Sequence, residues 1–294
     1  MTLIELIDLG SARLDAAQVA FGHGTDNAFD EASWLVLWRL GLPLDTPLDG
    51  LESLADTPVQ PQDQARVTAL FDQRIATRKP AAYLTGEAWL QGVPFYVDER
   101  AIVPRSFIAE LLAMDAIDPW LAPNATRVLD LCTGNGSLAV LAALAYPELH
   151  IDAADIDADA LAVARINVER HGLQQRIDLL LSDGWSALAQ RYDLVLCNPP
   201  YVNSASMAQL PPEYRAEPTL ALAGGTDGMG FIRRMLRGAA QHLQAGAALV
   251  LEIGHERDHF EAAFPRLELV WLQTSAGPDQ VVLITREALL AGAA

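Results

Sequence analysis

The sequence contains only two cysteines, Cys132 and Cys197, among 294 residues. Two cysteines cannot form a disulfide framework, and free thiols suit a reducing cytosol. No uncharged apolar run approaches the ~18 residues that a membrane span needs. The stretch Met1–Asp8 carries acidic residues where a signal peptide would carry Lys or Arg. We therefore expect a soluble, cytoplasmic protein that does not associate with membranes.

Basic residues are also scarce. The chain has 20 Lys and Arg against 38 Asp and Glu, which gives a net charge of −18. Nucleic-acid binding needs a basic face for phosphate contacts, so this balance argues against stable DNA binding. It favours a basic partner, or simply solubility. The hydrophobic fraction of 51% is ample for a large core, and the length suits one domain of about 200 residues plus a smaller one.

Residues 1–82 predict a small helical N-terminal domain without visible chemistry. Apolar side chains recur at helical spacing in 3–14 and 34–40, and a third helix is expected over Gln62–Thr77. We expect this domain to help recognise the substrate. Residues 83–105 alternate with period two between turn residues and predict a β-hairpin linker. Ser106 can then cap a helix running to about Ile117.

Residues 106–294 predict an α/β domain. After Pro123, short apolar runs alternate with helical patterns, which is typical of a doubly wound sheet. The last two strands have only a turn at 277–279 between them and should form an antiparallel hairpin. Seven strands ending in this way indicate a Rossmann-like methyltransferase sheet rather than a dehydrogenase sheet. The expected strands are 127–131, 150–154, 176–181, 193–197, 247–253, 268–272 and 280–285, and the expected helices lie near 137–146, 158–171, 229–244 and 256–263.

The first motif is Asp130-x-x-x-Gly134-x-Gly136, placed between a strand and a helix. Glycines let the backbone approach a ligand closely, and the helix start offers free N–H groups. The next strand ends in Asp155, where a carboxylate can accept hydrogen bonds from ribose hydroxyls. Dinucleotide enzymes have a similar fingerprint. However, Asp130 before the turn would repel a pyrophosphate, whereas it suits the cationic or hydroxyl-rich parts of S-adenosylmethionine.

The second motif is Asn198-Pro199-Pro200-Tyr201, which follows the fourth strand of this sheet. The Asn198 side-chain oxygen and the Pro199 carbonyl could each accept one N–H of a planar NH2 group. They would orient its nitrogen toward a methyl donor and favour the charge that builds there. The prolines fix the carbonyl direction and leave no competing N–H, and Tyr201 can lie flat against the planar group. The alternative is an ordinary turn, because Asn-Pro is common in turns. The aperiodic stretch from 202 to 228 predicts a long functional loop after this motif.

Together, the pattern Asp-x-x-Thr-Gly-x-Gly at 130–136 and Asn-Pro-Pro-Tyr at 198–201 resembles the class I S-adenosylmethionine-dependent glutamine N5-methyltransferases. These enzymes modify glutamines of proteins. Within that family, residues 95–100 and 103–110 are similar to the branch that acts on the third protein of the large ribosomal subunit, uL3. The branch that acts on release factors typically reads Pro-Arg-Pro where this chain has Pro104-Arg105-Ser106. Other shared segments are Tyr83–Glu87, Glu217–Pro218, Leu220–Leu222 and Asp227–Gly228.

The resemblance implies S-adenosylmethionine as cofactor, no metal, and uL3 as the protein substrate. An acidic surface agrees with a basic ribosomal protein as partner. The resemblance also implies that Asn198, Pro199, Pro200 and Tyr201 bind the substrate glutamine, and we expect Asn198, Pro199 and Tyr201 to carry the catalysis. Gly184 stands where relatives often carry a larger side chain, and we do not expect it to be a contact. Asn135 and Ser137 also depart from the commoner residues of the turn. The expected cofactor contacts are Asp130, Thr133, Gly134, Asn135, Gly136, Ser137, Asp155 and Asp183, the last at the adenine end.

The segment His255–His259 fits the zinc-protease pattern His-Glu-x-x-His. A helix start rich in Glu and Asp is the plainer explanation, so we expect no metal there. Glu252 ends the fifth strand without an assigned function. Alternatives to the uL3 branch are a release-factor glutamine methyltransferase, an N6-adenine methyltransferase that grips an exocyclic amine, and a cofactor-sensing assembly factor for ribosomes that has no catalysis.

Overall fold

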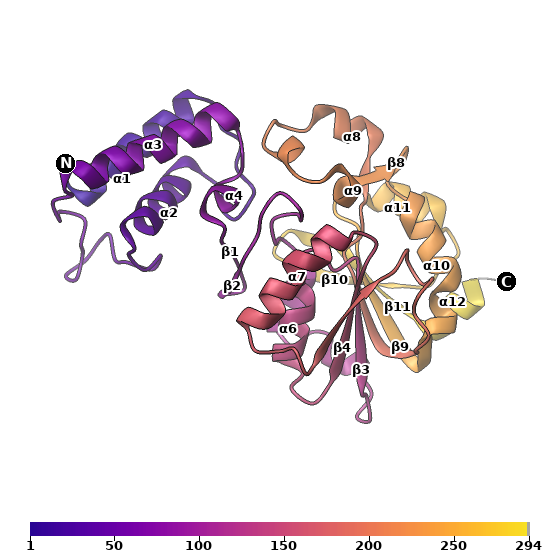
Figure 1. Ribbon diagram of the computed structural model, residues 1–294. Helices are drawn as coiled ribbons and strands as arrows, with labels where there is room; N and C mark the ends of the chain where they lie inside the picture. Colours follow the sequence, from indigo (N-terminus) through magenta and orange to yellow (C-terminus); the bar gives the residue numbers. More distant parts are fainter. Residues whose placement is uncertain (293–294) are drawn as a thin grey trace. The chain divides into compact units, whose positions relative to one another are not determined.

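The computed structural model describes residues 1–292 (Figure 1). They form two compact units. The helical unit comprises Met1–Ala88 and returns at Leu210–Ala216, and the sheet unit comprises Trp89–Gln209 and continues from Glu217. None of the helices within these 292 residues is long and apolar enough to cross a membrane.

The helical unit packs four helices, α1 (Leu3–Ala16), α2 (Ala28–Leu40), α3 (Pro61–Thr77) and α4 (Ala81–Thr85). A capping box begins α1, in which the Thr2 side chain accepts from the Glu5 N–H and the Glu5 side chain accepts from the Thr2 N–H. Gly10 lets α1 approach the Phe71 ring, since a Cβ at this position would lie 2.0 Å from Phe71 Cζ. The expected third helix is confirmed and begins one residue earlier, at Pro61.

The segment 210–216 is held in the helical unit by a buried ion cluster. Arg74 is completely buried and donates to Glu31 Oε1 (2.8 Å) and to Glu213 Oε1 (3.3 Å). Arg78 reaches the same Glu213 oxygen at 2.7 Å. Our expectation of an irregular loop over 202–228 is therefore wrong, because long-range ion pairs order this stretch. It contains β7 (Val202–Asn203), α8 (Ser204–Gln209), η2 (Tyr214–Ala216), α9 (Thr219–Leu222) and β8 (Ala223–Gly225).

The region expected to form a hairpin linker is only partly extended. The strands β1 (Ala88–Leu90) and β2 (Val93–Phe95) pair, but residues from 83 to 85 belong to α4. Gly86 ends that helix with φ of 66°, a left-handed value that glycine adopts without strain. Ser106 caps α5 (Phe107–Ala113) as expected, with its side chain accepting from the Ile108 N–H. That helix ends four residues before the expected Ile117.

The sheet unit contains the expected seven-stranded sheet, in the order β10-β11-β9-β6-β3-β4-β5. All neighbours are parallel except the two pairs made by β11, which confirms the antiparallel ending. Thr274 pairs with Gly277, so the turn between the last strands lies two residues earlier than expected. The strands are β3 (Arg127–Leu131), β4 (His150–Asp155), β5 (Ile177–Leu181), β6 (Tyr192–Cys197), β9 (Leu243–Glu252), β10 (Val270–Thr274) and β11 (Gly277–Thr285).

Helices cover both faces of this sheet (Figure 1). Successive residues of a strand point to opposite faces, so Leu194 and Leu196 of β6 pack in one core and Val195 and Cys197 in the other. The first core is covered by α5, α6 (Ser137–Ala145) and α7 (Ala158–Arg170), and the second by α10 (Gly230–His242), α11 (Arg257–Ala263) and α12 (Arg286–Gly292). These layers leave the carboxyl ends of β3, β4 and β6 together at one edge.

Candidate functional site

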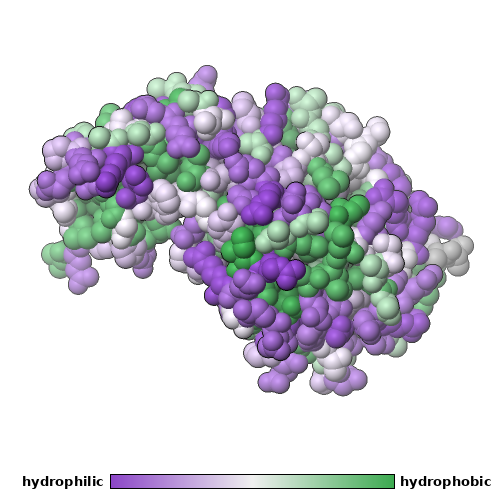
Figure 2. Space-filling model, in the orientation of Figure 1, coloured by the Kyte–Doolittle hydropathy of each residue, from purple (hydrophilic) through white to green (hydrophobic). Residues whose placement is uncertain are grey.

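A cavity of about 310 Å³ lies at the carboxyl ends of the parallel strands. The strand order reverses at β3, which has β4 on one side and β6 on the other. Ligands of open α/β sheets bind at such a switch point. Figure 2 shows hydrophobic side chains gathered on this side of the sheet unit, with hydrophilic ones around them. The walls come from the strand ends, from 100–102, from 182–184 and from 218–234.

The glycine turn after β3 is closed from inside by Asp130. This carboxylate is fully buried and accepts from the Thr133 hydroxyl and from the Ala139 N–H (2.9 Å). Burial raises the pKa of Asp130 to about 7. At Gly136, φ is 80° and a Cβ would lie 3.0 Å from Ala164 Cβ, so only glycine lets the turn approach α7. Asp130 thus shapes the turn and does not line the cavity.

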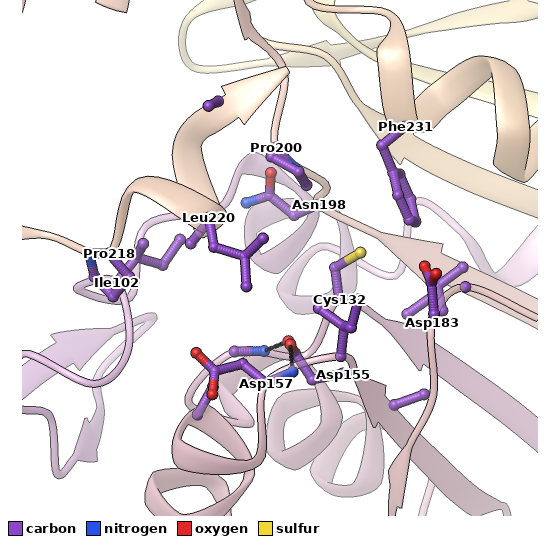
Figure 3. Close-up of a pocket in the computed structure, with 18 of the residues that line it drawn as sticks. Ile102, Cys132, Asp155, Asp157, Asp183, Asn198, Pro200, Pro218, Leu220 and Phe231 are labelled. Carbon is purple, nitrogen blue, oxygen red and sulfur yellow. Dashed lines mark hydrogen bonds between the residues drawn. The ribbon is translucent and has the colours of Figure 1, made fainter. Parts of the chain in front are cut away.

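Asp155, at the end of β4, links the turn to the cavity. Its Oδ2 accepts from the Gly134 N–H at 2.8 Å, and its Oδ1 accepts from the Asp157 N–H at 2.9 Å (Figure 3). Burial raises the pKa of Asp155, and these backbone donors oppose that shift. Asp155, Asp157 and Asp183 all line the cavity. These carboxylates can accept from hydroxyl groups and suit a cation, and Arg100 and Arg234 also line the cavity.

Asn198 is the first residue after β6 and its side chain is directed into the cavity (Figure 3). Within residues 1–292 its side-chain amide makes no hydrogen bond, although it is half-buried. Pro200 also lines the cavity, whereas Pro199 and Tyr201 do not. The Tyr201 ring packs on Gly254, where a Cβ would lie 2.4 Å from Tyr201 Cε2. The motif therefore presents a polar amide to the cavity and anchors itself behind it.

The predicted cofactor residues separate into two groups. Gly134, Asp155 and Asp183 line the cavity. The others lie behind its wall: Asn135 Oδ1 accepts from the Ser137 N–H at 3.0 Å, and Asn135 Nδ2 donates to the Ile102 carbonyl at 3.1 Å. These contacts account for a polar side chain at position 135, and a cofactor contact of the second group stays a prediction. That group comprises Asp130, Thr133, Asn135, Gly136 and Ser137.

The structure adds lining residues that sequence reasoning missed. Gly184 lines the cavity, and a Cβ there would lie 4.0 Å from Phe231, which also lines it; that Gly184 makes no cofactor contact stays a prediction. Arg100 and Ile102 contribute from the segment before Val103. Leu220 contributes from α9. The resemblance of segments 103–105 and 217–222 to the family was the sequence signal for this wall. The residue spacing within these segments does not by itself indicate a cavity.

Glu217 joins those two segments. It is buried and accepts from both Nη atoms of Arg105 (2.6 Å each) and from the Val103 N–H (2.9 Å). A bidentate guanidinium–carboxylate pair of this kind is among the stronger ion pairs in proteins. It holds Pro218, and the lining residues after it, against the segment that precedes α5.

The two cysteines flank the site as free thiols. Cys132 lines the cavity and has φ of 65°, a left-handed backbone that non-glycine residues rarely adopt. The pKa of the Cys132 thiol is raised well above its ordinary range, mainly by a hydrogen bond with Cys197 and secondly by burial. Cys132 therefore stays a neutral thiol in the wall of the cavity that Asn198 also lines.

The zinc-like motif has another role in the structure. Glu256 accepts from the Asn203 side chain at 2.7 Å and pairs with His259 Nδ1 at 2.5 Å, while His255 contacts Gln280. Both carboxylate oxygens of Glu256 are thus engaged in holding neighbouring side chains. In the described part of the chain, only His150, Asp152 and Asp178 form a group of three His, Cys, Asp or Glu residues with all their ligand atoms within 4.8 Å of one another.

That second group is also unsuited to a cation. Arg127 donates to both oxygens of Asp152, at 2.8 and 2.9 Å, and the Tyr192 hydroxyl donates to one of them at 2.8 Å. A guanidinium thus already bonds to both oxygens of one of the three groups, and its charge would repel a metal ion.

Comparison with known proteins agrees with this geometry. The Methyltransferase small domain model matches residues 111–210. Over 98% of this chain and 96% of the relative, the sequence is 55% identical to the ribosomal protein uL3 glutamine methyltransferase of Bordetella pertussis. The chain belongs to the family of ribosomal protein uL3 glutamine methyltransferases. The protein of the same name from Burkholderia pseudomallei is 53% identical over 96% of this chain and 94% of its own length, and that from Neisseria gonorrhoeae 46% over 98% and 96%.

Membership of the uL3 glutamine methyltransferase family confirms the resemblance that the two motifs indicated, and it makes the protein a methyltransferase. The fold has a more distant counterpart in the catalytic domain of hMettl16 in complex with MAT2A 3′UTR hairpin 6. That chain is 14% identical, with a TM-score of 0.52 over 77% of this chain and 81% of its own. At this identity the likeness concerns the fold alone.

Proposed function

We propose that the protein transfers a methyl group from S-adenosylmethionine to the side-chain nitrogen N5 of a glutamine in ribosomal protein uL3. One observation carries the chemistry: the Asn198 amide lines a cavity that also holds three carboxylates, and its side chain makes no hydrogen bond within residues 1–292. A half-buried amide without a partner has a free acceptor and a free donor for a ligand. The names of the relatives supply the substrate.

The cavity suits S-adenosylmethionine. Asp155 would accept from its ribose hydroxyls, Gly134 would allow its close approach, and Asp183 would lie at the adenine amino group. Leu220 and Phe231 offer apolar surface for a planar base. When bound, this cofactor supplies an electrophilic methyl group on a positively charged sulfur. The three carboxylates of the cavity wall are compatible with that positive charge.

The substrate amide needs orientation, because its nitrogen lone pair is delocalised. The Asn198 Oδ1, in the cavity wall, would accept one N–H of the glutamine NH2 group, and the carbonyl of Pro199, a residue that does not itself line the cavity, would accept the other. Both acceptors become more favourable as positive charge builds on that nitrogen during transfer, and they hold it in line with the donor. Pro199 and Pro200 have no N–H that could compete for these acceptors. The proton leaves the nitrogen after it has been methylated, so no strong base is required.

Substrate recognition would involve the helical unit, Met1–Ala88 with Leu210–Ala216, and the sheet unit would carry out the transfer. The net charge of −18 favours a basic protein partner and fast encounter with it. An enzyme that methylates a ribosomal protein would act in the cytoplasm, which fractionation of cells would check.

The test uses labelled S-adenosylmethionine. The purified enzyme is offered unmethylated uL3, unmethylated release factors and DNA, and mass spectrometry locates the label. We expect label on a uL3 glutamine. Label on a release factor would retain the amide chemistry but overturn the reading of Ser106 and the ribosomal target, whereas label on DNA alone would refute glutamine transfer.

A further inference from the structure

The carboxylate of Glu252 lies directly behind the proposed glutamine site. Glu252 is the last residue of β9 and is 1% exposed. Its Oε2 accepts from the Ser106 hydroxyl at 2.6 Å and from the Phe107 N–H at 2.9 Å. Its Oε1 accepts from the Tyr201 hydroxyl at 3.5 Å. All these residues belong to the sheet unit, and Tyr201 is the last residue of the Asn-Pro-Pro-Tyr motif.

Such a carboxylate is costly to keep. A buried acid without a directly bonded cation loses its hydration, and stability alone would favour an apolar side chain here. Burial accordingly raises the pKa of Glu252 to about 7, while the hydrogen bond from Ser106 opposes the shift. Arg105 favours the charged form from a distance but bonds to Glu217 instead. A buried acid at the edge that carries the site therefore calls for a role there.

Tyr201 is confined on its other sides by glycines. A Cβ on Gly254 would lie 2.4 Å from its ring, one on Gly228 would lie 2.2 Å from its carbonyl oxygen, and one on Gly224 would lie 2.7 Å from its carbonyl carbon. Gly228 and Gly254 also have positive φ values of 76° and 54°. Backbone thus surrounds the residue closely, and its hydroxyl faces Glu252.

The next residues are held in a similar way. Glu256 lies four positions after Glu252. Its Oε1 accepts from the side-chain amide of Asn203 at 2.7 Å and from the backbone N–H of Asn203 at 3.3 Å. The end of β9 and the turn after it thus hold the chain at 201 and again at 203. Between them these contacts fix the chain immediately after Asn198.

We propose that Glu252 is a positioning residue for the glutamine site: it holds the Tyr201 hydroxyl, and through Tyr201 it fixes the direction of the Asn198 amide. Ser106 holds the carboxylate in turn, so the start of α5 is coupled to the substrate motif by two side-chain hydrogen bonds. This inference rests on the proposed function, because it takes the Asn198 amide to bind the substrate. It assigns a role to a residue that touches neither substrate nor cofactor.

The test is a double-mutant cycle between Glu252 and Tyr201. Y201F removes one hydroxyl, and E252Q keeps the volume while changing how the group can bond. Each should lower kcat with glutamine substrate by about tenfold, the effect of losing one hydrogen bond of this kind, and leave cofactor affinity unchanged. If Glu252 acts through Tyr201, the double variant should be about as slow as the slower single one. Multiplied effects, or a change confined to cofactor affinity, would overturn the proposal.

A readout without catalysis separates this inference from the proposed function. Amide hydrogen exchange in the 201–209 segment should increase in E252Q and in Y201F. The control E110A removes a half-buried acid of α5 that bonds to Ser275, and should leave that exchange unchanged. Unchanged exchange in E252Q would refute the positioning role, even in an enzyme active on glutamine. Conversely, increased exchange in a protein that methylates no glutamine would support the contact and refute the proposed function.

Discussion

The variant N198A tests the proposed chemistry most directly. The Asn198 side chain makes no hydrogen bond within residues 1–292 and is half-buried. Truncating it therefore removes only packing contacts. We expect the free energy of unfolding to change by about 0.5 kcal/mol or less, as for substitutions away from structural features. The cavity keeps its carboxylates and its apolar walls, so cofactor affinity should stay within a few-fold of wild type.

Turnover should fall far more. Two acceptors, the Asn198 side-chain oxygen and the Pro199 carbonyl, would hold the reacting nitrogen, and N198A removes one of them. Removing a single preorganised group that stabilises developing charge costs about 2.7–4 kcal/mol, or a factor of about 10²–10³ in kcat. N198D keeps an acceptor oxygen in the same place and should retain more activity than N198A.

The assay compares single-turnover rates at saturating cofactor, with cofactor affinity measured by calorimetry and folding by urea titration. S204A, which alters an exposed side chain of α8, is the matched control and should behave as wild type. Turnover of N198A within threefold of wild type would refute the role of this amide. A parallel collapse of cofactor affinity would instead assign Asn198 to the cofactor.

Three further predictions follow from buried carboxylates and their partners. D155N should weaken cofactor affinity by about tenfold or more in calorimetry, because a charged acceptor beside the Gly134 N–H is lost; unchanged affinity would exclude Asp155 from the cofactor site. Burial raises the pKa of Glu252 from 4.5 and that of Asp130 from 3.8, each to about 7, so the native state binds more protons than the unfolded chain between those values. The free energy of unfolding should therefore fall as pH rises from about 4 to 7. In E252Q and in D130N, urea titrations at several pH values should show that this free energy depends less on pH than in wild type. R74A should cost about 3–5 kcal/mol in the helical unit because it leaves the buried Glu31 without its guanidinium and leaves Glu213 paired with Arg78 alone, whereas the exposed R66A should cost less than about 1 kcal/mol in the same denaturation experiment.

The contacts of Ser106 give the family branches a physical difference to examine. In this chain the Ser106 hydroxyl caps α5 and donates to Glu252. A proline at this position, as in the release-factor pattern, has no hydroxyl for that bond. The position that separates the two patterns in sequence is therefore connected to the substrate motif through one carboxylate.

Much of the sheet could be predicted from the sequence because its signals are local. Apolar runs of strand length, such as 127–131 and 193–197, alternate with helical patterns, and all seven expected strands occur with boundary shifts of a few residues. Both motifs could be placed for the same reason, since each directly follows a strand. Parallel strands then bring the two motifs to one edge of the sheet.

The stretch 202–228 could not be predicted in this way. Its short elements are ordered by contacts between residues far apart in the chain, such as Glu213 with Arg74 and Glu217 with Arg105. No periodicity within the stretch records those partners. The wall that this stretch gives to the cavity was missed for the same reason.

Thus the sequence by itself determined the sheet, the ends of its strands and the residue types that meet there, because hydrophobic period and turn chemistry act over a few residues. Only the tertiary structure decided what each polar group faces. It placed Asp130 inside the turn and Asp155 on the cavity wall. It showed that Glu256 of the zinc-like motif accepts a hydrogen bond from Asn203. It also put Glu252 beneath Tyr201. Burial and hydrogen bonding depend on partners that the chain brings together only when it folds.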